Sequence, residues 1–202
     1  MFDALVIGGG AAGMQCALVL GSAHKTAYAK DKKIGIVMHQ KASHLQSALL
    51  NNVLGIAPGT NGMEILKQGK EQLETLYPHV SQIEKEKVTS VVKEGNYFSV
   101  TTNKGNYQAR IVVIALGYTD MFSIKGLEQF IEPHALSPKE KNRIQLKNKN
   151  HLVEEGLYVA GTLAGGRSQF AIAAGSGAQV ATDILTLWNN GKHTKVHDKI
   201  TE

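Results

Sequence analysis

The feature that most constrains the fold is a glycine-rich segment near the start of the chain, VIGGGAAGMQ, at residues 6–15. Gly8, Gly10 and Gly13 follow a short apolar run with the spacing Gly-x-Gly-x-x-Gly. In this pattern the first glycine permits a tight turn, the second leaves room for a pyrophosphate, and the third lets a helix lie close to a strand. The N-terminus of that helix offers free N–H groups and partial positive charge to phosphates. The segment therefore predicts a strand, a phosphate-binding turn and a helix.

The residues that flank this turn complete a strand–helix–strand unit. Residues 3–7 predict a short buried strand, residues 11–23 a helix of small and apolar side chains, and residues 33–38 (KIGIVM) a second buried strand. A βαβ unit of roughly 30 residues is the context in which the glycine pattern binds a dinucleotide. The sequence therefore predicts an α/β fold that begins with a dinucleotide-binding unit.

The end of the second predicted strand departs from the usual dinucleotide-binding pattern. Such folds place an acid about 20 residues beyond the glycines, where its carboxylate binds ribose hydroxyls. Here the strand ends in Met38, His39, Gln40 and Lys41, with no carboxylate. His39 or Gln40 can donate to a hydroxyl instead, whereas a basic group at this point would suit the 2′-phosphate of NADP. An exposed histidine that binds nothing is the third alternative.

Beyond this unit the hydrophobic pattern changes from helical to alternating and back. β-Branched, alternating runs separated by two Gly-Asn-Tyr triplets predict a three-stranded antiparallel β-meander, which leads into another buried strand at 111–115. The predicted elements, in chain order, are a helix over 64–76, meander strands over 88–92, 97–102 and 107–116, a polar connector over 118–150 with one short helix and a strand at 143–147, a strand over 157–160 and a helix over 169–188. We expect a single domain over 1–190, with a parallel sheet and one helix layer, and a polar tail over 191–202.

Composition and charge limit the classes of function. Of the 202 residues, 43% are hydrophobic, which is enough for one substantial core. The net charge of +5 is typical of a solvated surface, and with 6% aromatic residues the chain lacks the pattern of a nucleic-acid-binding surface. No apolar run approaches the roughly 20 residues of a membrane span, and no basic segment precedes the first apolar residues as in a signal peptide. We expect a cytoplasmic protein that binds neither nucleic acid nor membrane.

Candidate redox and metal-binding residues are few. Cys16 is the only cysteine, which excludes an internal disulfide and a Cys-x-x-Cys pair, and its place on the first helix predicts a small buried residue. His193 and His197 have the i, i+4 spacing of helical metal ligands, but they lie in the polar tail without a supporting acid. We expect no metal site, and no side chain is marked as a catalytic nucleophile, acid or base.

Several distant segments together resemble one family. The segments are GGGAAG (8–13), ALLNNVLG (48–55), GMEILKQGKEQL (62–73), VIALG (113–117), GLYVAGT (156–162) and SQFAIAAGSG (168–177). In this order they resemble the FAD-binding domain of the thioredoxin-reductase-like branch of the pyridine-nucleotide-disulfide oxidoreductases, if one large gap is allowed. Agreement among distant segments is stronger than the glycine pattern alone. The resemblance implies a Rossmann-like FAD-binding domain and an FAD-dependent oxidoreductase.

The resemblance also implies where FAD would be held. The glycine turn corresponds to the pyrophosphate loop, Asn52 to a residue that approaches the flavin, and the last helix to one that begins against the isoalloxazine. The implied cofactor-binding residues are Gly8, Gly10, Ala11, Ala12, Gly13, Met38, His39, Asn52, Val88, Ala115, Leu116, Gly117, Gly161, Thr162, Gln169, Phe170 and Ala171. At the last three, backbone N–H groups at a helix N-terminus are expected to meet a polar acceptor.

The departures from the family pattern concern its second domain and its acids. Family members carry an NAD(P)H domain after an Ala-Thr-Gly turn. In this chain the corresponding turn has Leu116 in place of the threonine. About forty residues separate Gly117 from Gly156, too few for a usual βαβ domain, and there is no second Gly-x-Gly-x-x-Gly. Thr162 replaces the carboxylate that binds the ribityl chain. A neutral hydrogen bond contributes about 0.5–1.5 kcal/mol, against about 1.5–3 kcal/mol for one to a charged group, so we expect weakened FAD binding.

These patterns lead to two hypotheses of function. The first is an FAD-binding oxidoreductase that uses no disulfide chemistry and takes electrons from free NAD(P)H, a partner reductase or its substrate. Arg167 would then stabilise reduced flavin or bind an anionic substrate, with an exposed loop arginine as the alternative. Because two carboxylates are missing, the second hypothesis is a non-catalytic nucleotide-binding or interaction module. A homodimer is implied by the resemblance alone.

Overall fold

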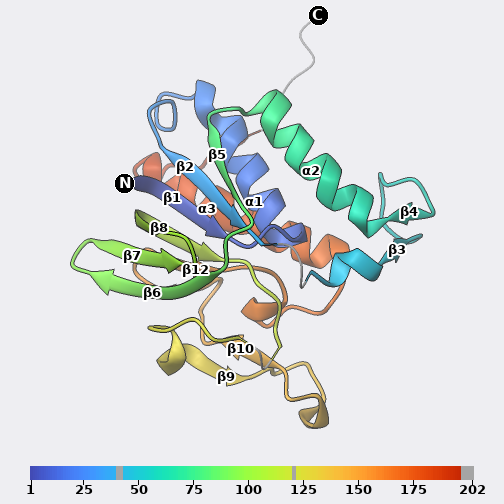
Figure 1. Ribbon diagram of the computed structural model, residues 1–202. Helices are drawn as coiled ribbons and strands as arrows, with labels where there is room; N and C mark the ends of the chain where they lie inside the picture. Colours follow the sequence, from blue (N-terminus) through green and yellow to red (C-terminus); the bar gives the residue numbers. More distant parts are fainter. Residues whose placement is uncertain (40–42, 120–121, 197–202) are drawn as a thin grey trace, which may run out of the picture.

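A mixed β-sheet forms the centre of the computed structural model, which describes residues 1–39, 43–119 and 122–196. Eight strands of this described part form the sheet, whose central path runs β11–β12–β8–β1–β2–β5 (Figure 1). Their bounds are Leu152–Glu154 for β11, Leu157–Val159 for β12, Asn106–Ile114 for β8, Phe2–Ile7 for β1, Ile34–Met38 for β2 and Val80–Glu84 for β5. All five strands from β12 to β5 are parallel, and β11 is antiparallel to β12. The predicted α/β fold with a mainly parallel sheet is confirmed.

A three-stranded antiparallel β-meander extends from one end of this sheet. β6 (Val88–Glu94) pairs with β7 (Tyr97–Thr102), and β7 pairs with the first half of β8. The predicted meander is confirmed, but the expectation of a separate strand at 111–115 is wrong. That segment belongs largely to the second half of β8, which pairs with β1 and β12. No glycine or proline interrupts residues 106–114, so one strand continues from the first pairing into the second.

The α-helices lie on one side of the sheet and the meander on the other (Figure 1). Their bounds are Ala11–Ser22 for α1, Gly62–Leu76 for α2 and Phe170–Trp188 for α3, each within two residues of the prediction. Successive side chains of a strand point to opposite faces. Ala4 and Val6 of β1 therefore join the core beneath α1 and α3, while Leu5 and Ile7 join the core on the meander side.

The last helix, α3, corrects the expectation that no apolar run approaches the length of a membrane span. It has 19 residues and a mean hydropathy of 1.3 over its apolar window, so by length and composition it reaches the size of a membrane span. Val180, Ala181, Ile184 and Leu185 are buried in one core cluster with α1 and the sheet. The core helix of a folded domain passes the same test of length, but only 28% of the apolar window of α3 is buried, so this packing accounts for one face of the helix.

Several short strand pairings were not predicted from the sequence. β5, beside β2, has the weakly apolar sequence VSQIE, in which only Val80 is buried. In the connector, the expected strand pairs with a second strand to form a hairpin. The expected short helix is replaced by single 3₁₀ turns. The strand predicted at 143–147 is confirmed as β10 (Ile144–Leu146); the unpredicted pieces are its partner β9 (Ile131–Pro133), the pair β3 (Leu49–Leu50) and β4 (Thr60–Asn61), and the 3₁₀ turns Glu128–Phe130 and Lys139–Lys141.

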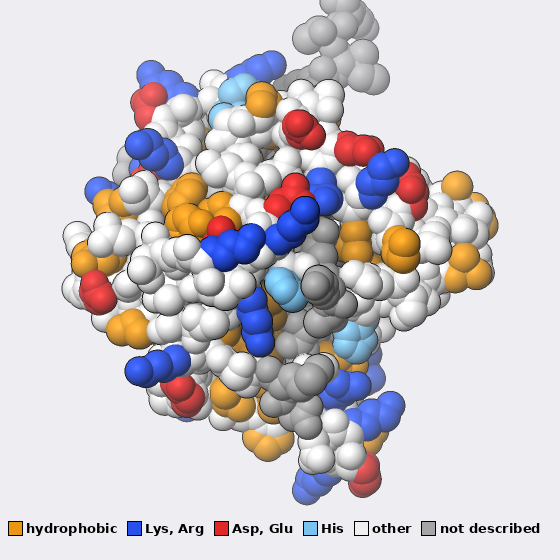
Figure 2. All heavy atoms as spheres, viewed as in Figure 1, with side chains coloured by type: hydrophobic (Ala, Val, Ile, Leu, Met, Phe, Trp, Pro, Cys, Tyr) orange, Lys and Arg blue, Asp and Glu red, His pale blue; other side chains and the backbone are white. Residues whose placement is uncertain are grey.

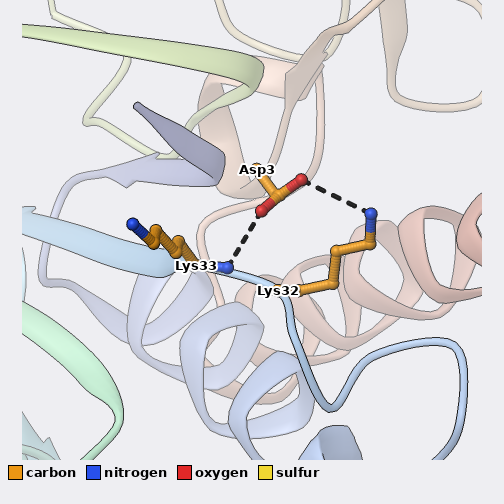
Figure 3. Close-up of polar contacts among 3 residues, drawn as sticks. All are labelled: Asp3, Lys32 and Lys33. Carbon is orange, nitrogen blue, oxygen red and sulfur yellow. Dashed lines mark hydrogen bonds and ion pairs between the residues drawn. The ribbon is translucent and has the colours of Figure 1, made fainter.

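Asp3 connects the beginning of β1 to the beginning of β2 (Figure 3). Its Oδ2 accepts the backbone N–H of Lys33 at 3.0 Å, and its Oδ1 lies 3.4 Å from Lys32 Nζ. Lys32 also lies over the ring of Trp188 at the end of α3, with Nζ 5.4 Å from the ring centroid. These contacts support the β1–β2 register, which places the glycine turn beside the end of β2.

Candidate functional site

The candidate site lies at the carboxyl ends of four neighbouring parallel strands. The glycine turn follows β1, His39 follows β2, residues 115–117 follow β8, and residues 161–162 follow β12. In open α/β sheets, ligands bind at this edge of the sheet. Because β12, β8, β1 and β2 are adjacent, the structure brings most of the predicted site residues to one edge.

Gly8 and Gly13 are required by the packing of the protein itself. Gly8 has a φ of +119°, and a Cβ built on it would lie 2.2 Å from the carbonyl oxygen of Ala115. A Cβ on Gly13 would lie 1.8 Å from the carbonyl oxygen of Gly8. The turn and the start of α1 are therefore packed too closely for any side chain at either position.

Gly10 differs from both, because the described part of the protein leaves space beside it. Its φ is −83°, which any residue adopts, and a Cβ built on it would meet only Ser43 Oγ, at 3.7 Å. Gly10 is also the N-cap of α1, where no side chain caps the helix and the first turn carries no acid. An open position at an uncapped helix N-terminus fits a pyrophosphate.

The turn after β12 packs against the start of α1. Gly161, with a φ of +78°, donates its N–H to Ser176 Oγ at 2.7 Å, and a Cβ on Gly161 would lie 3.1 Å from the Cβ of Ala12. Thr162 is half-buried beside it. The two glycine-containing turns are thus neighbours, and Ser176, which sequence reasoning missed, holds the second one in place.

The start of α3 corrects part of the prediction for residues 169–171. Gln169 is the N-cap, and its Oε1 accepts the N–H of Ile172 at 3.0 Å. The backbone N–H of Gln169 donates to the carbonyl oxygen of Arg167 at 2.9 Å, so this N–H is not available to a ligand. Phe170 and Ala171 remain the candidate donors at this helix N-terminus, and Arg167 is exposed.

Of the two predicted cofactor-binding residues at the end of β2, one is exposed and one is buried. Met38 is 2% exposed and belongs to the helix-side core, whereas His39 is exposed. The N–H of Gly8 donates to the carbonyl oxygen of Val37 at 2.9 Å, so this strand end lies directly beside the glycine turn. Gln40, the other candidate donor, lies outside the described residues.

Two predicted residues are not brought to the glycine turn by any described contact. Asn52 is exposed in the loop between β3 and β4, where its neighbour Asn51 accepts the N–H of Gly59 at 2.7 Å. Val88 is 7% exposed, and its side chain lies in the meander-side core. Val88 therefore has only its backbone to offer to a ligand.

The connector supplies a cluster beside Thr162 that no sequence pattern indicated. His134 is 5% exposed; its Nδ1 accepts the N–H of Leu136 at 3.2 Å, so its Nε2 carries the proton and donates to the carbonyl oxygen of Thr162 at 3.1 Å. The ring of Tyr118 lies 5.2 Å from His134, and the Arg143 guanidinium lies 4.8 Å from the Tyr118 ring centroid. The connector therefore buttresses the turn that carries Thr162.

The remaining redox and metal candidates form no second site within the described residues. Cys16 is fully buried, as predicted, and this burial raises the pKa of its thiol to about 12. A thiol in this state supplies no thiolate near neutral pH. In the ranges that the structure describes, no group of three metal-ligating side chains occurs, while His197 lies outside those ranges.

The fold and this edge define an α/β dinucleotide-binding domain of the Rossmann type, with an antiparallel β-meander. The sequence matches the pyridine nucleotide-disulphide oxidoreductases over residues 2–162. The chain belongs to this family, a family of FAD-dependent oxidoreductases, and its single cysteine leaves it without a Cys-x-x-Cys pair.

Individual relatives are distant. Ferredoxin–NADP reductases from Levilactobacillus brevis and Streptococcus mutans are 30% identical over 116 residues and 31% identical over 124 residues. These matches cover 57% and 58% of this chain and 34% of each relative, so the chain spans about a third of the length of these relatives.

The structural neighbours include thioredoxin reductases. The one from Gloeobacter violaceus has a TM-score of 0.71 and 14% identity, covering 100% of this chain and 99% of that chain. The one from Lactococcus lactis has a TM-score of 0.68 and 12% identity, covering 94% of this chain and 100% of that chain. At these identities the likeness shows the fold alone.

Proposed function

We propose that this chain is an FAD-binding oxidoreductase domain that uses no disulfide chemistry and has no NAD(P)H domain within residues 118–150. The observation that carries the proposal is Gly10, an open position at an uncapped helix N-terminus. Membership of a family that typically binds FAD supports the choice of this dinucleotide. The burial of Cys16 supports the absence of thiol chemistry.

In this proposal the polypeptide binds and orients the cofactor, and bound FAD would supply the two-electron chemistry. The N–H groups at the start of α1 would face the pyrophosphate, and His39 would face the adenosine ribose. The N–H groups of Phe170 and Ala171 and the hydroxyl of Thr162 would serve the flavin end. Each of these groups follows a strand end or begins a helix at the same edge of the sheet.

Two missing carboxylates set the expected affinity. Replacing a charged hydrogen bond by a neutral one costs about 1 kcal/mol, which corresponds to roughly fivefold in Kd. Two such replacements weaken binding roughly 30-fold relative to a site with both acids. We therefore expect FAD to be partly lost during purification and restored by titration.

The test is a Gly10→Ala variant compared with a Gly105→Ala control. A Cβ on Gly105 meets no described atom within 4 Å, and this residue lies in the β7–β8 turn, outside the glycine turn. Gly10→Ala should fold with a loss of about 1 kcal/mol or less, the cost of alanine at an N-cap, and should bind FAD at least about tenfold more weakly, because its methyl group occupies the pyrophosphate space. The readouts are the visible spectrum and the quenching of FAD fluorescence. Wild-type protein that neither shows a flavin spectrum nor quenches added FAD would exclude the proposal.

The electron donor and acceptor form a further part of the proposal. The names of the curated relatives, ferredoxin–NADP reductases, suggest NADP(H) and a small electron-carrier protein as exchange partners. Reduction of the FAD-loaded protein by NADPH, NADH or a separate reductase, followed at the flavin absorbance, distinguishes these sources. Reduction by none of them would favour the alternative below.

A non-catalytic nucleotide-binding or interaction module is the second candidate function. The observation that favours it is the loss of both carboxylates, leaving Thr162 and His39 at the two ends of the site. A thermal-shift screen of FAD, FMN, NAD, NADP and ADP separates the cases, since a shift with FAD supports the first proposal. A shift with none of them supports an interaction role.

We also propose the organisation of the molecule. Residues 1–190 would form one domain with 118–150 as its connector, and 191–202 would form a polar tail. We place the protein in the cytoplasm, without nucleic-acid or membrane binding, and as a homodimer. The modest net charge of +5 supports the solvated surface, and light scattering tests the dimer.

A further inference from the structure

The ends of β2 and β5 form a small surface beside the glycine turn. Met38 and Glu84 are paired in the parallel register of these strands, and the backbone N–H of Lys85 donates to the carbonyl oxygen of Met38 at 2.8 Å. Lys85 therefore follows directly on the end of β5, next to the residue that precedes His39. His39, Lys85 and Lys87 are all exposed here. We call these three residues the ribose-edge group, in which Lys85 and Lys87 are the cations.

The acids near this edge are engaged by other protein groups. Glu84 Oε2 lies 3.0 Å from Lys70 Nζ of α2. Glu86 accepts hydrogen bonds from the hydroxyls of Thr102, at 2.6 Å, and Tyr107, at 3.1 Å. Both oxygens of Glu86 are therefore engaged, whereas Glu84 is held by Lys70 through one oxygen.

Among the residues that the structure describes, the side chains of the ribose-edge group, by contrast, make no hydrogen bond or ion pair. Figure 2 shows Lys or Arg side chains and a histidine in the middle of the viewed face, with Asp or Glu side chains among them, over the region where β2 and β5 end and β6 begins in Figure 1. Lys85 and Lys87, which have no acidic partner among the described residues, favour an anion at this place.

The position of these groups relates them to one part of a nucleotide. The residue after the second strand of a dinucleotide-binding unit contacts the adenosine ribose, an acid there binds a free 2′-hydroxyl, and a basic group accommodates a 2′-phosphate. In this chain no acid follows Met38 directly, and Lys85 and Lys87 are exposed nearby. The surface therefore favours a phosphorylated ribose over a free hydroxyl pair.

We propose that the ribose edge of this site binds the 2′-phosphate of an adenine nucleotide, so that the glycine turn accepts NADP(H) as well as FAD. The two ligands would compete, because each would place its pyrophosphate at the same glycine turn. Only NADP(H) carries the 2′-phosphate, so only NADP(H) would use the cations at the ribose. The proposal rests on the proposed function in one respect: an adenine nucleotide must occupy the glycine turn. Lys85 and His39 are its binding residues, and Lys87 strengthens the local positive field.

The test compares nucleotides that differ by one phosphate. Adenosine 2′,5′-bisphosphate, adenosine 3′,5′-bisphosphate and 5′-AMP are titrated by calorimetry at low salt, and NADP is compared with NAD. Since a charge-assisted phosphate contact tightens binding about tenfold or more, we expect the 2′,5′-bisphosphate to bind at least about tenfold tighter than 5′-AMP. The preference should narrow with added salt. The 3′,5′-bisphosphate should bind more weakly than its 2′,5′ isomer.

Two charge-matched variants locate the effect. Lys85→Gln removes the cation beside Met38, whereas Lys30→Gln removes an exposed cation before the amino end of β2, at the opposite edge of the sheet. Lys85→Gln should lower the 2′-phosphate preference at least about threefold, and Lys30→Gln should leave it unchanged. An equal loss in both variants would show a general charge effect and would overturn the proposal.

A parallel FAD titration separates this inference from the proposed function. FAD binding without any preference for the 2′,5′-bisphosphate would overturn the inference and leave the proposed function standing. A 2′-phosphate preference without FAD binding would support the inference and overturn FAD as the cofactor. Equal binding of the two bisphosphates would overturn the assignment to the 2′ position. Binding of no nucleotide would overturn both.

Discussion

A pair of glycine substitutions on α3 tests the helix packing that supports the glycine turn. Gly175 and Gly177 lie two residues apart on this helix, and each is replaced by alanine. A Cβ on Gly175 meets no described atom within 4 Å, whereas a Cβ on Gly177 would lie 1.9 Å from the carbonyl oxygen of Ala12. In a helix, alanine is favoured over glycine by about 0.5–1 kcal/mol. The two variants share this gain and differ in the clash.

The two variants should change the free energy of unfolding in opposite directions. Gly175→Ala has only the propensity gain of about 0.5–1 kcal/mol. Real Cβ atoms essentially never come within 3.0 Å of such neighbours, so Gly177→Ala must separate α1 from α3 by roughly the difference between 3.0 and 1.9 Å. Overpacking costs about 1–3 kcal/mol, and the upper end applies because the opposing atom belongs to the backbone. The net loss is then about 2 kcal/mol.

Urea denaturation followed by circular dichroism measures both changes, with the slope m expected to stay constant. In a chain of this size, 1 kcal/mol corresponds to about 2–4 °C in Tm, so Gly177→Ala should lower Tm by about 4–8 °C and Gly175→Ala should raise it by about 1–4 °C. Because Ala12 lies in the first turn of α1, Gly177→Ala should also weaken nucleotide binding. A Gly177→Ala protein as stable as wild type would refute the close crossing of the two helices.

Two titratable side chains give further expectations. Burial lowers the pKa of His79 below 6.5, assisted by His24 and opposed by the hydrogen bond to Gly21. The folded state then binds fewer protons than the unfolded state, so the free energy of unfolding should fall as the pH drops below about 6.5. Urea titrations of wild type and His79→Gln check this, and identical pH slopes would contradict it. The raised pKa of buried Cys16 predicts no reaction with Ellman's reagent at about pH 8 until the protein unfolds; rapid labelling of native protein would contradict the burial.

The predictable parts of the fold are those whose signals lie in residues close together in the sequence. The glycine turn with its strand and helix, the meander with its two Gly-Asn-Tyr turns, and the last helix all depend on residues close in sequence. β5 was missed because its stability comes from pairing with the fully buried β2, which its own sequence does not reveal. Strand propensity is decided by such neighbours more than by intrinsic preference.

The turns of the candidate site could be predicted from the sequence, but the residues from distant segments that hold these turns in place could not. Strand ends and helix starts carry glycine signals, so the edge of the sheet could be located. Contacts between distant segments carry no such signal: His134 in the connector donates to Thr162, and Ser176 on α3 accepts from Gly161. The competition of the Arg167 carbonyl for the N–H of Gln169 is likewise visible only in the folded chain.

The three glycines of the glycine turn differ in whether the packing of the protein itself requires them. Gly8 and Gly13 are held by main-chain contacts within the protein, so they would be needed to fold this turn whether or not a nucleotide binds. Their presence therefore argues for the fold and not for a ligand. Gly10 has an ordinary φ, and a Cβ on it would meet no described atom closer than Ser43 Oγ at 3.7 Å, so the described packing does not require a glycine there. Under the proposed function, a substitution that leaves the described packing intact and weakens nucleotide binding is available at Gly10 alone among the three, which makes it the position at which fold and function can be tested separately.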